Sequence, residues 1–227
     1  GGDKAVKEPR RVALSILRET YGAALPDEAT LPTLQAFSGH ELRVLDQMQA
    51  RGVRSPRTSS AGRLFDAVAS IIGLRQVCRF EGQAAMELEF LTHGVHTEGF
   101  YPFDLASSDE GVSVDWAPMV RAIVDELRQC VPLAAIATKF HNTLVEMMVR
   151  VATECDEEKV TLSGGCFQNR YLTERAVKRL QEAGFRPYSH QRVPPNDGGI
   201  ALGQVLAVAR AQTKTKSKAT ERQSVCA

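Results

Sequence analysis

The spacing of apolar residues changes along the chain, and this change constrains the fold more than any other feature. Over the first 75 residues apolar side chains recur every three or four positions, as in amphipathic helices, in the sets Val12, Ala13, Ile16 and Leu17, and Leu42, Leu45 and Met48. From about residue 84 apolar and polar residues begin to alternate. Residues 86–91 are therefore predicted to form a half-buried strand, with further strands at 100–105 and 112–114.

The second half of the chain alternates between helical and strand patterns. We expect helices at 120–127, 134–153, 171–183 and 199–211, and strands at 159–162 and 186–189. This order predicts an α/β fold with a mixed sheet. The chain divides into a helical segment (1–75), an α/β subdomain (76–211) and a polar, basic tail (212–227) that is expected to be disordered.

Charge and cysteine content exclude several classes of protein. With 28 Lys and Arg against 27 Asp and Glu, the chain has no electrostatic signature of nucleic-acid or membrane binding. No apolar run approaches the roughly 18 residues of a membrane span, and the polar N-terminus is no secretory signal. The five cysteines lack CxxC spacing, which favours reduced thiols and a cytoplasmic protein.

The stretch 160–169 carries the strongest local signal for a ligand site. A predicted strand runs into Gly164 and Gly165, and a helix follows Asn169. Glycines let a ligand approach the backbone closely, and the start of a helix favours an anion. The other reading is a tight turn in which Asn169 caps the helix. Cys166 lies in this turn but has no neighbouring histidine, which favours a packing role over a catalytic thiol.

Two further stretches combine a turn with a carboxylate. In 193–200 two prolines precede Asn196 and Asp197, so that Asp197 could hold a metal ion or could cap a helix. In 59–66 Gly62 permits close approach, while Arg63 and Asp66 lie on one helical turn. That pair could meet the phosphate and ribose of a nucleotide, or could form an ordinary ion pair within the helix.

Four stretches in order resemble the carbamoyltransferase HypF family, which takes part in nickel–iron hydrogenase maturation: 58–69, 80–89, 162–170 and 193–204. Residues 1–4 and 8–10 also fit. The resemblance covers residues 1 to about 210 and implies the second lobe of a Kae1-like domain, with an actin/Hsp70/sugar-kinase type fold. The family's complete proteins are much longer and carry acylphosphatase-like and YrdC-like domains as well.

The resemblance also implies a reaction and its partners. In the family, carbamoyl phosphate and ATP give carbamoyl-adenylate, and the carbamoyl group passes to the C-terminal cysteine of the acceptor protein HypE. It implies that Gly62 and Asp66 face adenosine and ribose, that Gly164, Gly165 and Asn169 contact the nucleotide, and that Asp197 binds a divalent metal (Fe, Zn or Mg). The family's metal-binding histidines belong to a His-rich motif that this sequence lacks, so the chain alone is expected to be inactive.

Other readings remain open from the sequence. An antibiotic O-carbamoyltransferase or a tRNA-threonylcarbamoyl transferase would share the fold. A module that docks a partner protein without catalysis would explain the missing histidines, although the intact glycine turns at 164–165 and 198–199 argue against it. No catalytic residue is assigned.

Overall fold

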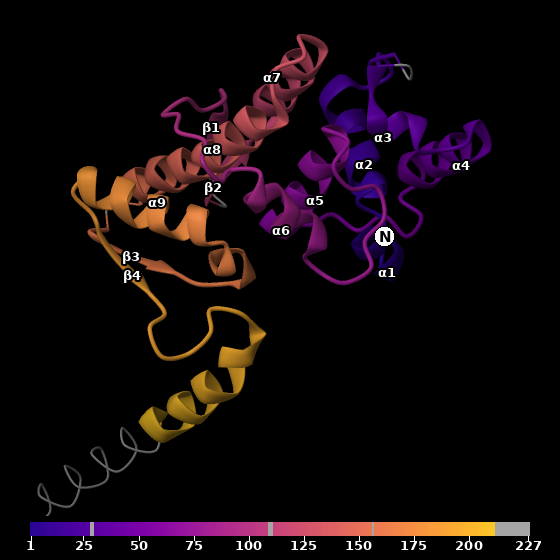
Figure 1. Ribbon diagram of the computed structural model, residues 1–227. Coiled ribbons are helices and arrows are strands. Elements are labelled where there is room, and N and C mark those ends of the chain that lie inside the picture. Colours follow the sequence, from indigo (N-terminus) through magenta and orange to yellow (C-terminus); the bar gives the residue numbers. More distant parts are fainter. Residues whose placement is uncertain (28–29, 109–110, 156, 212–227) are drawn as a thin grey trace, which may run out of the picture.

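The computed structural model describes residues 1–27, 30–108, 111–155 and 157–211 (Figure 1). The predicted disordered tail at 212–227 lies outside the described residues. Among the described residues, five α-helices precede residue 75: α1 (Asp3–Lys7), α2 (Pro9–Tyr21), α3 (Pro32–Gln35), α4 (Gly39–Ala50) and α5 (Ala61–Ile71). The helical character predicted for this part of the chain is therefore confirmed.

Helices α2 and α5 form the core of the N-terminal part. Pro9 begins α2, where a missing N–H costs nothing, and Ala13 and Leu17 are completely buried. They pack on α5, in which Val68 and Ile71 are also completely buried. Both helices carry apolar residues at helical spacing, so the sequence pattern predicted the face that packs.

The strand predicted at 86–91 is wrong, because this stretch is part of helix α6 (Gln83–Phe90). The alternating apolar residues do not mark a buried face: Met86 is 45% exposed and Phe90 is 64% exposed. The buried residues are Ala84 and Leu88, one helical turn apart. Gln83 stabilises the helix by donating a hydrogen bond from its side chain to Glu87 over 2.9 Å.

The strands form two separate two-stranded sheets in the described part of the chain. Strands β1 (Asp104–Ser108) and β2 (Gly111–Asp115) are antiparallel, whereas β3 (Lys159–Leu162) and β4 (Arg186–Ser189) are parallel. The two kinds of pairing expected of a mixed sheet are thus both present. The strand predicted at 100–105 begins later, because Tyr101 is buried and its N–H donates to the Thr143 hydroxyl.

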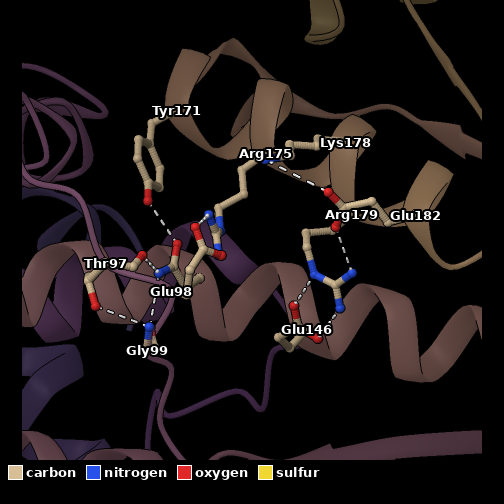
Figure 2. A network of polar contacts seen from close by, with 10 residues as sticks. Thr97, Glu98, Gly99, Glu146, Tyr171, Arg175, Lys178, Arg179 and Glu182 are labelled. Atoms are coloured by element: carbon tan, nitrogen blue, oxygen red, sulfur yellow. Dashed lines mark hydrogen bonds and ion pairs between the residues drawn. The ribbon is translucent and has the colours of Figure 1, made fainter.

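The long helix α8 (Leu133–Glu154) carries the C-terminal part. It follows α7 (Ala117–Arg128) and contacts α9 (Arg170–Glu182), with β3 and β4 beyond α9 (Figure 1). The Arg179 guanidinium donates two hydrogen bonds to Glu146 on α8, at 2.7 and 3.0 Å. Figure 2 shows this pairing of Arg179 with Glu146. Nearby, the Tyr171 hydroxyl on α9 donates to the Asn142 amide oxygen on α8. These contacts fix α9, and with it the turn that precedes α9.

The last described helix, residues 200–211, projects away from the rest of the chain (Figure 1). All its residues are exposed, including five large apolar side chains that are more than half exposed: Ile200, Leu202, Val205, Leu206 and Val208. Within the described ranges, no helix combines the length and the apolar character that crossing a membrane requires.

Lysine substitutions in this projecting helix should leave the stability of the chain almost unchanged. Val205 is 66% exposed and Leu206 is 51% exposed, so Val205→Lys and Leu206→Lys remove little buried surface. We expect each to alter the free energy of unfolding by about 0.5 kcal/mol or less, measured by urea unfolding. Leu180→Lys, at a completely buried position of α9, is the control and should cost about 3 kcal/mol or more. A comparable loss in the helix variants would mean that this helix packs on the body in solution.

Candidate functional site

The glycine turn after β3 is joined directly to the proline-rich stretch. Gly164 has φ +107° and ψ 161°, a conformation that strains any residue with a side chain. A short 3₁₀ helix, η2 (Gly165–Gln168), follows. The Gly164 N–H donates a 2.8 Å hydrogen bond to the carbonyl of Pro195. The stretches 163–169 and 194–199 therefore meet in space.

Asn169 ends this turn and caps α9, so the capping interpretation is confirmed. Its side-chain oxygen accepts a 2.8 Å hydrogen bond from the Leu172 N–H, and its amide nitrogen lies 2.9 Å from Nε2 of His141. The residue is 9% exposed. Because its amide is bound within the protein, Asn169 positions the turn. A direct contact between its side chain and a nucleotide stays a prediction.

The third stretch lies at the start of α5. Arg63 and Asp66 form the predicted ion pair, with 2.8 Å between Arg63 Nη1 and Asp66 Oδ2. Those two atoms are buried but are not aligned as a hydrogen bond. Burial raises the pKa of Asp66 to about 6, an effect that the charge of Arg63 only partly opposes and that Glu81 reinforces. Gly62 is half-buried beside them.

Helix α5 also contacts the glycine turn. It packs against η2, and the ring of Phe65 lies 5.3 Å from the ring of His141, which binds Asn169. The stretches 59–66 and 194–199 thus both meet 163–169, so three parts of the chain that are distant in sequence converge at the glycine turn. The role of each residue toward a nucleotide stays a prediction.

Cys166 in the turn has the properties of a packing residue. Burial raises the pKa of its thiol, the charge of Arg63 opposes this and that of Asp66 adds to it. A raised pKa disfavours the thiolate, which is the nucleophilic form. The geometry therefore supports the interpretation that Cys166 is not a catalytic thiol.

Asp197 is exposed and is the first residue of a short 3₁₀ helix, η3 (Asp197–Gly199). The cap of η3 is Asn196, whose side chain accepts a hydrogen bond from the Gly198 N–H, so the predicted cap falls one residue before Asp197. The described residues contain no group of three His, Cys, Asp or Glu side chains that could hold a metal ion.

Two residues that support the turn were not predicted from the sequence. Glu89 on α6 accepts hydrogen bonds from the backbone N–H groups of Arg170 and Tyr171, at 2.6 and 3.3 Å. His141 on α8 is completely buried and bonded to Asn169. Both reach the turn from distant parts of the sequence, so local spacing carries no signal for either contact.

Comparison with known proteins identifies the family. Residues 1–204 match the family model described as the second subdomain of the Kae1-like domain of a carbamoyltransferase, HypF. The chain belongs to the HypF carbamoyltransferase family. Its Kae1-like α/β fold is shared with a solved structure of full-length HypF in the phosphate- and nucleotide-bound form. That likeness has a TM-score of 0.80 and 36% identity, over 90% of this chain and 26% of the solved one.

HypF relatives match nearly the whole chain. The chain is 40% identical to carbamoyltransferase HypF of Synechocystis sp. over 93% of its length and 29% of the relative's. It is 36% identical to HypF of Rhizobium leguminosarum bv. viciae over 100% of its length and 28% of the relative's. The chain therefore spans less than a third of the length of these two HypF proteins.

Proposed function

We propose that this chain is the nucleotide-binding part of a HypF carbamoyltransferase and that the turn at Gly164 and Gly165 receives the nucleotide. The observation that carries the proposal is that two distant stretches, 59–66 and 194–199, both contact this turn. The 2.8 Å hydrogen bond from Gly164 to Pro195 joins one of them, and the packing of α5 on η2 joins the other. The nucleotide named for the solved HypF structure supports the same assignment.

The proposed reaction is the one that the family resemblance implies. Carbamoyl phosphate and ATP give carbamoyl-adenylate, and the carbamoyl group then passes to the C-terminal cysteine of a HypE-like acceptor. Gly62 and Asp66 would face the adenosine and ribose, and Gly164, Gly165 and Asn169 the rest of the nucleotide. Asp197 would supply one oxygen ligand of a divalent metal (Fe, Zn or Mg), with the other ligands coming from outside the described residues.

Two of these glycines are not required by the fold, which supports a role toward a ligand. A Cβ added to Gly62 would lie 3.6 Å from the Ser60 hydroxyl, and one added to Gly165 would lie 4.0 Å from Gln168. Both are ordinary van der Waals distances. Neither residue has a positive φ. A glycine that neither backbone conformation nor packing demands is useful where a ligand must approach the chain.

Gly62→Ala should therefore separate stability from binding. Because alanine favours helix over glycine by up to about 1 kcal/mol, we expect equal or higher thermal stability. We also expect at least about tenfold weaker binding of ATP, measured by isothermal titration calorimetry, because the methyl group occupies the approach to the backbone. Gly165→Ala should weaken ATP binding similarly.

Gly203→Ala is the matched control for these variants. An added Cβ at Gly203 meets nothing within 4 Å, and this residue lies in the projecting helix 200–211. It should leave ATP affinity unchanged. If folded Gly62→Ala and Gly165→Ala bind ATP as tightly as the unmodified chain, the proposal that these glycines lie at the nucleotide site is wrong. An unmodified chain that binds no ATP would contradict the nucleotide assignment and favour a module that docks a partner protein.

A further inference from the structure

His141 has a defined tautomer and a defined acceptor. Its Nδ1 lies 2.7 Å from the carbonyl oxygen of Ala137, one turn earlier on α8, so Nδ1 carries the proton and donates it. Nε2 then carries a lone pair, and it lies 2.9 Å from the side-chain nitrogen of Asn169. The Asn169 amide therefore donates to the imidazole.

Aromatic rings from three helices hold the imidazole in place. The ring of Phe65 on α5 lies 5.3 Å away, that of Phe140 on α8 lies 5.6 Å away, and that of Tyr171 on α9 lies 5.5 Å away, all edge to face. His141 itself is completely buried. The ring cannot turn without displacing these neighbours, so the direction of its lone pair is determined by packing.

This direction decides which way the Asn169 amide faces. An asparagine amide can turn by 180°, which exchanges its oxygen and its nitrogen. Only when the nitrogen faces Nε2 does the oxygen face the Leu172 N–H and cap α9. The backbone N–H of Asn169 also donates to the Cys166 carbonyl, and the backbone N–H of Phe167 donates to the Gly164 carbonyl. Asn169 is therefore joined to the turn through its backbone as well as through its side chain.

We propose that His141 is a positioning residue, whose Nε2 orients the Asn169 amide and thereby holds the Gly164–Gly165 turn in the shape that receives the nucleotide. The proposal rests on the proposed function for the effect on the nucleotide, but not for the effect on the turn. An apolar side chain would fill the same volume between the three rings. Only an acceptor at the position of Nε2 satisfies the Asn169 donor.

The surroundings keep this acceptor available. Burial lowers the pKa of His141 to about 4, only partly opposed by its hydrogen bond to Ala137, so Nε2 stays unprotonated at neutral pH. If Nε2 were protonated, two N–H donors would face each other, and the hydrogen bond from the Asn169 amide would be lost. The imidazole thus works as a permanent acceptor near neutral pH.

A double-mutant cycle tests the proposal. His141→Leu removes the acceptor, whereas His141→Gln can place an amide oxygen near the position of Nε2. We expect ATP affinity to fall about tenfold in His141→Leu and to be largely restored in His141→Gln. Asn169→Ser keeps a good helix cap but cannot reach His141. In the Asn169→Ser background, His141→Leu should weaken ATP binding by less than about twofold, because the residue through which His141 acts is gone.

Amide hydrogen exchange measures how firmly the hydrogen bonds of the turn are held, and it needs no ATP. In His141→Leu, the Leu172 and Gly164 N–H groups should exchange at least about tenfold faster, since they bond to Asn169 and Pro195. Thr143→Val on the same helix is the control for lost stability, because it breaks another buried bond, to the Tyr101 N–H. It should leave ATP affinity and those two exchange rates unchanged.

The outcomes separate the two proposals. If the unmodified chain binds no ATP, the proposed function fails, and the exchange rates alone then decide whether His141 orients the turn. If Leu172 and Gly164 exchange as fast in His141→Leu as in the unmodified chain, the positioning role is overturned. It is also overturned if ATP binds and His141→Leu leaves its affinity unchanged, or if His141→Leu weakens it equally in both backgrounds.

Discussion

The isolated chain is expected to transfer no carbamoyl group to a thiol acceptor. Carbamoyl-adenylate synthesis and carbamoyl transfer both need carbonyl and phosphate groups to be held in a fixed geometry, and the proposed site holds the nucleotide alone. Asp197 is an exposed carboxylate without two partner ligands among the described residues, whereas bound divalent ions usually have three or more. The Synechocystis and Rhizobium HypF proteins are more than three times as long as this chain, and we propose that the missing groups lie in their additional length.

The assay mixes the chain with ATP, carbamoyl phosphate and a HypE-like acceptor and then weighs the acceptor by mass spectrometry. The acceptor mass should stay unchanged. A complete HypF protein treated in the same way is the positive control, and ATP binding by the chain is measured in parallel. A mass gain of one carbamoyl group that disappears on Asp197→Ala would show that this chain is catalytically complete.

Contacts between neighbours in the sequence were predictable. The Arg63–Asp66 pair is separated by one helical turn, and the Asn169 cap follows directly from a polar residue between a glycine turn and an amphipathic helix. Helices α7, α8 and α9 also follow from their apolar spacing. In each case the partners lie within a few residues, so the sequence alone brings them together.

Contacts between distant residues were not predictable in this way. Glu89 reaches the start of α9 only because α6 is a helix, and the alternation of Met86 and Phe90 with glutamates favoured a strand. The sequence around His141 also gives no indication that Asn169, 28 residues away, is its partner. The degree of burial of Asp66 likewise depends on how α5 packs, which no local pattern contains.

Asp66→Asn is expected to stabilise the chain above pH 6 and to lose this advantage in acid. The folded state raises the pKa of Asp66 from 3.8 to about 6, because the residue is buried, with 3% of its surface exposed. Above pH 6 the parent must bury an ionised carboxylate, which costs about 3 kcal/mol for a shift of this size. Between about pH 6 and 3.8 only the folded state binds the proton, so the parent gains stability as the pH falls. Asparagine does not titrate and gains nothing there.

The measured quantity is the difference in unfolding free energy between variant and parent, at pH 8 and near pH 3.5. It should change by about 3 kcal/mol in favour of the parent as the pH falls. The ion pair with Arg63 exists only while Asp66 is ionised, and its effect is already contained in the pKa of about 6, so it adds no further change to this difference. His141 acts in the opposite direction: its pKa falls from 6.5 to about 4 on folding, so acid destabilises the chain. That effect is common to both proteins and cancels in the difference.

Asp197→Asn, at an exposed carboxylate, is the control, and its difference from the parent should stay within about 0.5 kcal/mol at both pH values. A pH-independent difference for Asp66→Asn would mean that the Asp66 carboxyl is hydrated in solution. In that case α5 would not bury Asp66 against the rest of the chain as the structure has it, and the contact between α5 and η2 would be in question as well. The same titration therefore tests the burial of one carboxylate and the assembly of the proposed nucleotide site.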